Sequence, residues 1–228
     1  MSKSGFRYMV SISEPAFFSI MMSALESYQV GHSSDGSKDN SMVEVYGNLW
    51  GYKSQTQRNE SILRVVMADA DLSAKAEPDQ TTPHPEAYIL KTDFADAYFP
   101  EIEYLGDFHS HPYTEDETRS ELTLQRDDCH CRSRADMRFA DGLQKSGRPY
   151  RLQLVATIFK RDKIVKREDG YIKEDSSCIR FRYANMTIWI KAYVFDMNGD
   201  TFRKVADKMV AILCPSAGVH VNQIDAPN

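Results

Sequence analysis

The segment that most constrains this chain is an apolar run that ends in two histidines separated by one residue. Residues 102–108 (IEYLGDF) are strand-like, and His109-Ser110-His111-Pro112 follows directly. Residues i and i+2 of an extended segment point to the same face, so both imidazoles can approach one ion from one side. The spacing therefore predicts half of a zinc site, because imidazole nitrogen is a common zinc ligand. Two hydrogen-bonded histidines at a strand end are the alternative, and the surrounding sequence has to decide between them.

The composition indicates one globular α/β domain over residues 1–228, with no internal repeat and no dividing linker. Of the 228 residues, 42% are hydrophobic, which is enough to fill a sizeable core. The net charge of −5, with both signs interspersed, leaves no basic surface for a phosphate backbone and argues against nucleic acid as a partner. No run approaches the roughly 18 apolar residues of a membrane span. The four cysteines form no Cys-x-x-Cys pair, which favours free thiols and a cytoplasmic location.

Local patterns predict the main elements. Ser13 is the expected N-cap of a helix of about four turns, because Pro15 suits its first turn and apolar residues recur at helical spacing up to Tyr28. A long loop or partly ordered insertion is expected over about 113–132, and a loosely held tail from about 214. Further strands are predicted over 42–52, 61–69, 102–112, 152–159, 177–183 and 186–195, and helices around 94–99, 136–145 and 201–213.

The order of these parts resembles the JAMM (MPN-type) zinc metalloprotease family. The family pattern is a strand Glu with Gly three residues on, then His-x-His-Pro, then Ser-x-x-Asp. Glu44 with Gly47, followed by the His109 to Pro112 run, matches the first two parts, and the resemblance spans about residues 12–195. It implies a single-domain α/β fold of the MPN/JAMM type, similar to cytidine deaminases, in which a mixed β-sheet is flanked by helices.

The third part of the pattern is displaced. In the family the Ser-x-x-Asp follows the second His after a short loop, whereas the Ser-x-x-Asp downstream here is Ser133-Arg134-Ala135-Asp136. The family Asp opens a helix that leads into a hydrophobic strand, and Asp136 is followed by such a helix and by the strand from Leu152. This favours Asp136. Asp127 and Asp128 stay as alternatives, although neither has a Ser three residues before it.

By resemblance, His109, His111 and Asp136 would bind Zn²⁺, Glu44 would act as general base and then acid, and Ser133 would donate a hydrogen bond to the oxyanion. Such a site keeps a fourth position for water, whose pKa the ion can lower to about 7. The implied activity is hydrolysis of a peptide or isopeptide bond, with the C-terminal tail of a ubiquitin-like protein as the expected substrate.

Two other functions and a second metal site are alternatives to this interpretation. A non-catalytic MPN-like scaffold that binds other proteins is the main alternative, because the acidic ligand is displaced. A zinc nucleobase deaminase needs a His-x-Glu element and a later Pro-Cys-x-x-Cys run, and the sequence has neither. A second metal site at Cys129-His130-Cys131 is incomplete in sequence, because no matching Cys pair stands elsewhere. The oligomeric state is not indicated by any of these patterns.

Overall fold

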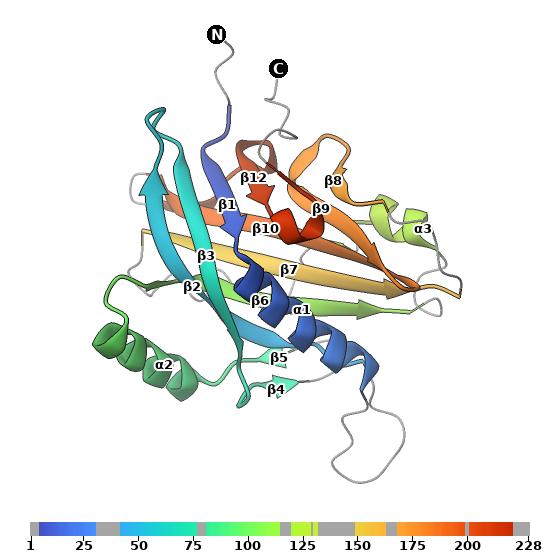
Figure 1. The fold of residues 1–228 in the computed structure, drawn as a ribbon, viewed down its shortest axis with the longest axis horizontal. Coiled ribbons are helices and arrows are strands. Elements are labelled where there is room, and N and C mark those ends of the chain that lie inside the picture. Colours follow the sequence, from blue (N-terminus) through green and yellow to red (C-terminus); the bar gives the residue numbers. More distant parts are fainter. Residues whose placement is uncertain are drawn as a thin grey trace.

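A computed structural model describes residues 5–30, 42–76, 81–114, 120–128, 130–131, 149–162, 168–198 and 201–220. Most strands join one ten-stranded sheet in the order β12-β1-β3-β2-β6-β7-β10-β9-β8, with β11 paired to β10 (Figure 1). A separate small ladder joins β4 and β5. The strands are β1 (Tyr8–Ile12), β2 (Tyr46–Gln55), β3 (Ser61–Ala70), β4 (Lys75–Ala76), β5 (Thr81–Thr82), β6 (Glu103–Tyr113), β7 (Tyr150–Lys160), β8 (Gly170–Ile172), β9 (Asp175–Tyr183), β10 (Met186–Asn198), β11 (Thr201–Lys204) and β12 (Val210–Leu213). The helices are α1 (Glu14–Gln29), α2 (Pro85–Tyr98) and α3 (Glu121–Arg126), with 3-10 turns η2 (Asp207–Met209) and η3 (Pro215–Ala217).

The sheet curls until its two ends meet. Ser176 in β9 donates a hydrogen bond from Oγ to the carbonyl of Val210 in β12, at 2.8 Å. The hydroxyl of Tyr171 in β8 donates to the carbonyl of Ile212 in the same strand. Because β12 and β8 lie at opposite ends of the strand order, these bonds give the sheet the shape of a half-barrel, with an inner and an outer face.

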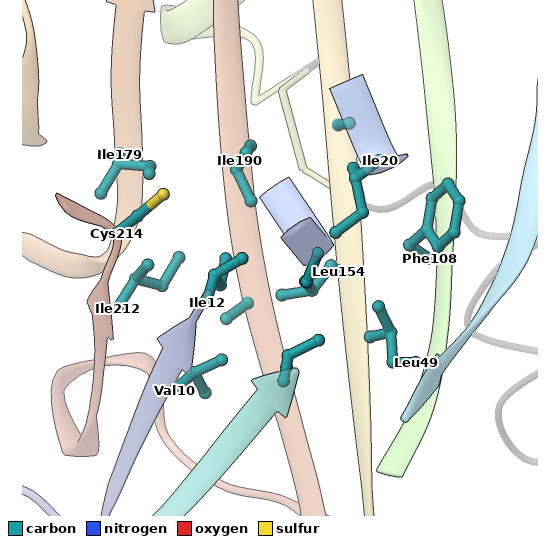
Figure 2. Close-up of a cluster of buried hydrophobic side chains, with 14 of the residues drawn as sticks. Val10, Ile12, Ile20, Leu49, Phe108, Leu154, Ile179, Ile190, Ile212 and Cys214 are labelled. Atoms are coloured by element: carbon teal, nitrogen blue, oxygen red, sulfur yellow. The ribbon is translucent and has the colours of Figure 1, made fainter. Parts of the chain in front are cut away.

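The inner face carries the main hydrophobic core. Alternate residues of β7, such as Leu152 and Leu154, point into it, and Phe108 of β6 does the same. Residues from both ends of the strand order, such as Ile179 and Ile212, close the cluster (Figure 2). The intervening residues of β6 and β7 therefore lie on the outer face.

Helix α1 packs across the inner face, as its sequence predicts. The Ser13 hydroxyl accepts a hydrogen bond from the amide of Ala16, which satisfies one of the free N–H groups of the first turn. Ile20, Ala24 and Tyr28 are buried in the core. The predicted N-cap and length of this helix are confirmed.

The predicted fold class is wrong, because the described residues form a curled sheet with few helices and not a sheet flanked by helices. Of its residues, α2 buries Ala95, whereas Ile89, Leu90 and Phe94 are exposed. Residues 201–213, predicted as a helix, instead form β11, η2 and β12. Val210, Ala211 and Ile212 are all buried, and such a short apolar run cannot be assigned to helix or strand by periodicity alone. The architecture is a mixed, curled sheet with few helices.

Other predicted elements agree better with the structure. Strands β2, β3, β6, β7, β9 and β10 occur within a few residues of the predicted ranges, and the helix around 94–99 is the end of α2. Helix α3 falls within the predicted insertion, where no helix was expected. The chain stays packed beyond 214, because Cys214 and Val219 are fully buried and bonded to each other through their backbones. The helix expected over 136–145 lies outside the described residues. None of the described helices combines the length and apolarity needed to cross a bilayer.

Gly106 in β6 allows the close approach of β7. Gly106→Ala is therefore expected to lower the free energy of unfolding by about 2–6 kcal/mol. Its φ is +153°, and an added Cβ would lie 1.7 Å from the carbonyl oxygen of Leu152. Gly170 is a matched control, because its φ is +156° but nothing lies within 4 Å of the added Cβ. Gly170→Ala should therefore cost only the backbone strain, about 1–3 kcal/mol. Equal losses for the two variants in urea unfolding would show that the clash with β7 is relieved without cost.

Candidate metal and catalytic site

The two histidines of the motif lie side by side on the outer face of β6. Phe108 points into the core, so His109 and His111 point away from it, and each is only 5% exposed. Their Nε2 atoms are 3.2 Å apart. Two nitrogens bound to one tetrahedral zinc at about 2.0–2.1 Å are about 3.3–3.4 Å apart. The pair is therefore spaced for a shared ion, and the same distance suits an N–H···N hydrogen bond in the metal-free protein.

Glu44 reaches the same place from the neighbouring strand. It was predicted inside a strand, but β2 begins at Tyr46, so Glu44 lies two residues before it. The position is fixed by Ser110: its amide donates to the carbonyl of Val45 at 2.9 Å, and its hydroxyl accepts from the Val45 amide at 3.0 Å. Glu44 Oε1 is then 3.9 Å from His111 Nε2, with the carboxylate side chain 12% exposed. Three predicted site residues are thus brought together.

Asp107 and Arg151 form a buried ion pair next to the histidines. Asp107, two residues before His109 on the same face, accepts hydrogen bonds from Arg151 (Nε, 2.8 Å) and from Gln153 (Nε2, 3.3 Å) in β7. Asp107 is fully buried and Arg151 is 7% exposed. Burial alone would lower the pKa of Arg151, but the Asp107 carboxylate and two nearby tyrosines raise it above its ordinary value. The guanidinium stays charged, so the pair cross-links β6 and β7 next to the site.

The proposed acidic ligand and oxyanion donor cannot be placed. Asp136 and Ser133 lie outside the described residues. Of the two alternatives, Asp127 is paired with Arg126 at the surface, and Asp128 belongs to a different cluster with His130 and Cys131. Among the residues that the structure describes, no third His, Cys, Asp or Glu forms with His109 and His111 a group whose ligand atoms all lie within 4.8 Å.

The structure also reveals a Ser-x-x-Thr turn that the sequence reading missed. Ser120 is the N-cap of α3 and comes nine residues after His111; its Oγ accepts from the amide of Thr123 at 3.1 Å. Thr123 occupies the position that Asp would have in a Ser-x-x-Asp pattern, a short distance after His111. A search for the Ser and its spacing, without requiring Asp, would have found it.

A pocket of about 400 Å³ lies between the outer face of the sheet and the start of α2. Tyr46, which lies directly opposite His109 in the β2–β6 ladder, forms part of its wall. Burial, more than the nearby Asp107, raises the pKa of Tyr46 well above its usual value, so its hydroxyl is neutral. The lining is rich in aromatic and proline side chains and consists of Tyr46, Asn48, Asp71, Pro83, His84, Pro85, Tyr88, Ile89, Tyr104 and Arg151.

Comparisons with known proteins do not assign this site to a protein family. No protein-family model matches the chain, and no curated protein matches it. Among solved structures, the solution structure of protein DSY2949 from Desulfitobacterium hafniense is similar at 13% identity and a TM-score of 0.45, over 90% of this chain and 92% of that one. The function is therefore inferred from the side chains of the site.

Proposed function

We propose that this protein is a zinc-dependent hydrolase that cuts a peptide or isopeptide bond, with the C-terminal tail of a ubiquitin-like protein as substrate. The observation that carries the proposal is the 3.2 Å separation of the His109 and His111 Nε2 atoms, with Glu44 Oε1 at 3.9 Å from His111 Nε2. Two imidazoles bound to one tetrahedral zinc lie at about this spacing, and a nearby carboxylate that is not a ligand can act as general base in hydrolysis. The JAMM-like motif supports the activity, although the described part of the chain does not form the helix-flanked fold that it implied.

Each residue of the proposed site would have a separate role in binding the metal or in the reaction. His109 and His111 would hold the ion, with Asp136 as third ligand, and the ion would polarise the scissile carbonyl and make water more acidic. Glu44 would take the proton of the attacking water and pass it to the leaving amine, for which its partly buried position is suitable. Ser133 would donate a hydrogen bond to the oxyanion.

Two features of the outer face suit an extended protein substrate. The β2–β6 ladder ends at the Tyr46–His109 pair, while β6 continues along β7 to Tyr113. An extended tail could therefore add main-chain hydrogen bonds beside the last residues of β6. The pocket next to Tyr46 has the size and apolar lining to hold a large side chain of that tail.

Cys131, Cys178 and Cys214 are free thiols, which supports a cytoplasmic site of action.

Metal analysis of the purified full-length chain tests the proposal. Both His109→Ala and His111→Ala should lower bound zinc by one equivalent and abolish hydrolysis, because two ligands cannot replace three. His220→Ala, at an exposed position, is the matched control and should change neither quantity. If both variants bind as much zinc as the wild type after reconstitution, the proposed activity is wrong.

A non-catalytic scaffold is the second candidate, and the observation that favours it is Thr123. If α3 carries the counterpart of the family's Ser-x-x-Asp, the acidic ligand has been lost and the histidine pair is a remnant. The doubly substituted His109→Ala, His111→Ala chain separates the candidates. Unchanged partner binding together with an unchanged cellular phenotype would favour the scaffold.

A further inference from the structure

The turn after α3 brings three potential metal ligands together in a group that does not include the histidine pair. The ligand atoms of Asp128, His130 and Cys131 all lie within 4.8 Å of one another. The turn is tight: Asp128 has a left-handed backbone with φ 53°, and its carbonyl accepts from the Cys131 amide at 2.9 Å. This hydrogen bond closes a turn that holds residues 128 and 131 close together.

His130 is the side chain that points to a ligand. It is 5% exposed, yet its Nδ1 atom is buried without a hydrogen-bond partner. The ring also makes a hydrogen bond to the backbone of Leu124 in α3. An imidazole that donates one N–H to a backbone carbonyl and keeps a lone pair on the other nitrogen is in the state in which metal-bound histidines are found. Burial lowers the pKa of His130, which keeps the ring neutral.

Cys131 supplies a thiol beside this ring. It is half-buried and packs against Val155, Tyr193 and Phe195 on the outer face. Burial raises its pKa, so the metal-free thiol is protonated. Binding of a divalent ion would break the S–H bond, form a metal–sulfur bond and release the proton to solvent. Asp128 is exposed, so its carboxylate gives the ion a route from solvent.

The nearest positive charge does not oppose a cation here. Lys191 is 1% exposed and contributes to the electrostatics of both His130 and Cys131. Its ammonium group, however, is paired with Asp175 at 2.5 Å and with Asp207 at 3.3 Å, and it donates to Ser177 at 2.8 Å. Asp207 also pairs with Lys204 at 2.7 Å, so two carboxylates balance two ammonium groups and the Asp128 carboxylate makes the region net negative.

We propose that Asp128, His130 and Cys131 form a second metal site, which binds a borderline-soft divalent ion such as Zn²⁺ through one oxygen, one nitrogen and one sulfur atom. This ligand set suits zinc, whereas Mg²⁺ and Ca²⁺ prefer oxygen ligands alone. The ion ties the turn after α3 to the outer face, where the Thr157 hydroxyl donates to the His130 carbonyl at 3.4 Å. Thr157 is the β7 residue opposite His111, so the second site braces the strand next to the first.

Titration of the reduced, metal-free full-length chain with Co²⁺ tests this site independently of the proposed activity. A thiolate ligand gives Co²⁺ a near-ultraviolet charge-transfer band, which the sulfur-free His109–His111 site cannot produce. The wild type should show the band, and Cys131→Ser should lose it. Cys129→Ser and the doubly substituted His109→Ala, His111→Ala chain should keep it. Absence of the band in the wild type, or its persistence in Cys131→Ser, overturns the proposal.

Asp128 is exposed, so a substitution there is expected to leave the fold intact. Asp128→Asn should keep the far-ultraviolet circular dichroism spectrum and weaken Co²⁺ binding at least about tenfold, as the loss of even an outer-shell partner does. Asp127→Asn is the matched control, because this neighbouring acid is paired with Arg126 and is outside the cluster. Equal Co²⁺ affinity in the two variants would remove Asp128 from the site and overturn the three-ligand assignment.

Discussion

Glu44→Gln is expected to lower the rate of amide-bond hydrolysis by about 10²–10⁴-fold, the usual contribution of a positioned general base. Glutamine has nearly the same shape as glutamate but cannot accept a proton at neutral pH. The backbone contacts between Val45 and Ser110 that place residue 44 do not depend on its side chain. Steady-state kinetics and metal analysis on the same sample are the measurements, and the zinc content should match that of the wild type.

The control for this variant is Glu26→Gln on the exposed side of α1, which removes one carboxylate far from the motif in sequence. It should hydrolyse substrate at the wild-type rate. If Glu44→Gln loses zinc together with activity, then residue 44 is a ligand and not a base. If it keeps full activity, another group takes the proton and the catalytic assignment fails.

Asp107→Asn is expected to lower the free energy of unfolding by about 3–5 kcal/mol, because it leaves the buried Arg151 guanidinium without its counter-charge. Asp107 is fully buried and Arg151 is 7% exposed, so water cannot compensate for the loss. The Gln153 amide loses a charged acceptor at the same time. Urea unfolding followed by circular dichroism measures the change.

Asp127→Asn offers a matched comparison, since Arg126 contacts Asp127 in a similar arginine–aspartate pair at the surface. Solvent screens that pair, and its removal should leave the unfolding free energy unchanged within error. A small effect of Asp107→Asn, similar to that of Asp127→Asn, would mean that water reaches Arg151. Since Asp107 is two residues before His109, the buried variant is also expected to weaken zinc binding at the histidine pair.

The parts of the site that depend on spacing within one strand could be predicted from the sequence, and those that depend on a loop could not. The alternation of β6 is enough to place His109 and His111 on one face. The proximity of Glu44 followed from the resemblance, while its position before β2 was not foreseen. Ser120 and Thr123 were missed because the required acid was absent. Cys129-His130-Cys131 was considered incomplete as a metal site in sequence, and the burial of His130 and the proximity of Asp128 are known only from the structure.

The fold was predicted well where packing on one face leaves a clear period and poorly where it does not. Helix α1 has a capping Ser13 and a regular apolar stripe, so its bounds were foreseen. The segment from Val210 to Leu213 is buried almost throughout between β1 and β9, so its sequence carries no period that distinguishes helix from strand. The helix-flanked architecture itself was an expectation of the family resemblance, and the misassigned segment agreed with it.

The pairing of β1 with β12 has a kinetic consequence. Tyr8 lies opposite Val210 in a parallel ladder, so a strand near the start of the chain gains one of its two neighbours from a strand near the end. Contacts between residues so distant in sequence are slow to form, because a long loop must close before they contribute free energy. During synthesis on the ribosome, the sheet therefore stays open along β1 until nearly all of these residues have emerged, and its exposed edge is the place where a nascent chain of this kind is most vulnerable to aggregation.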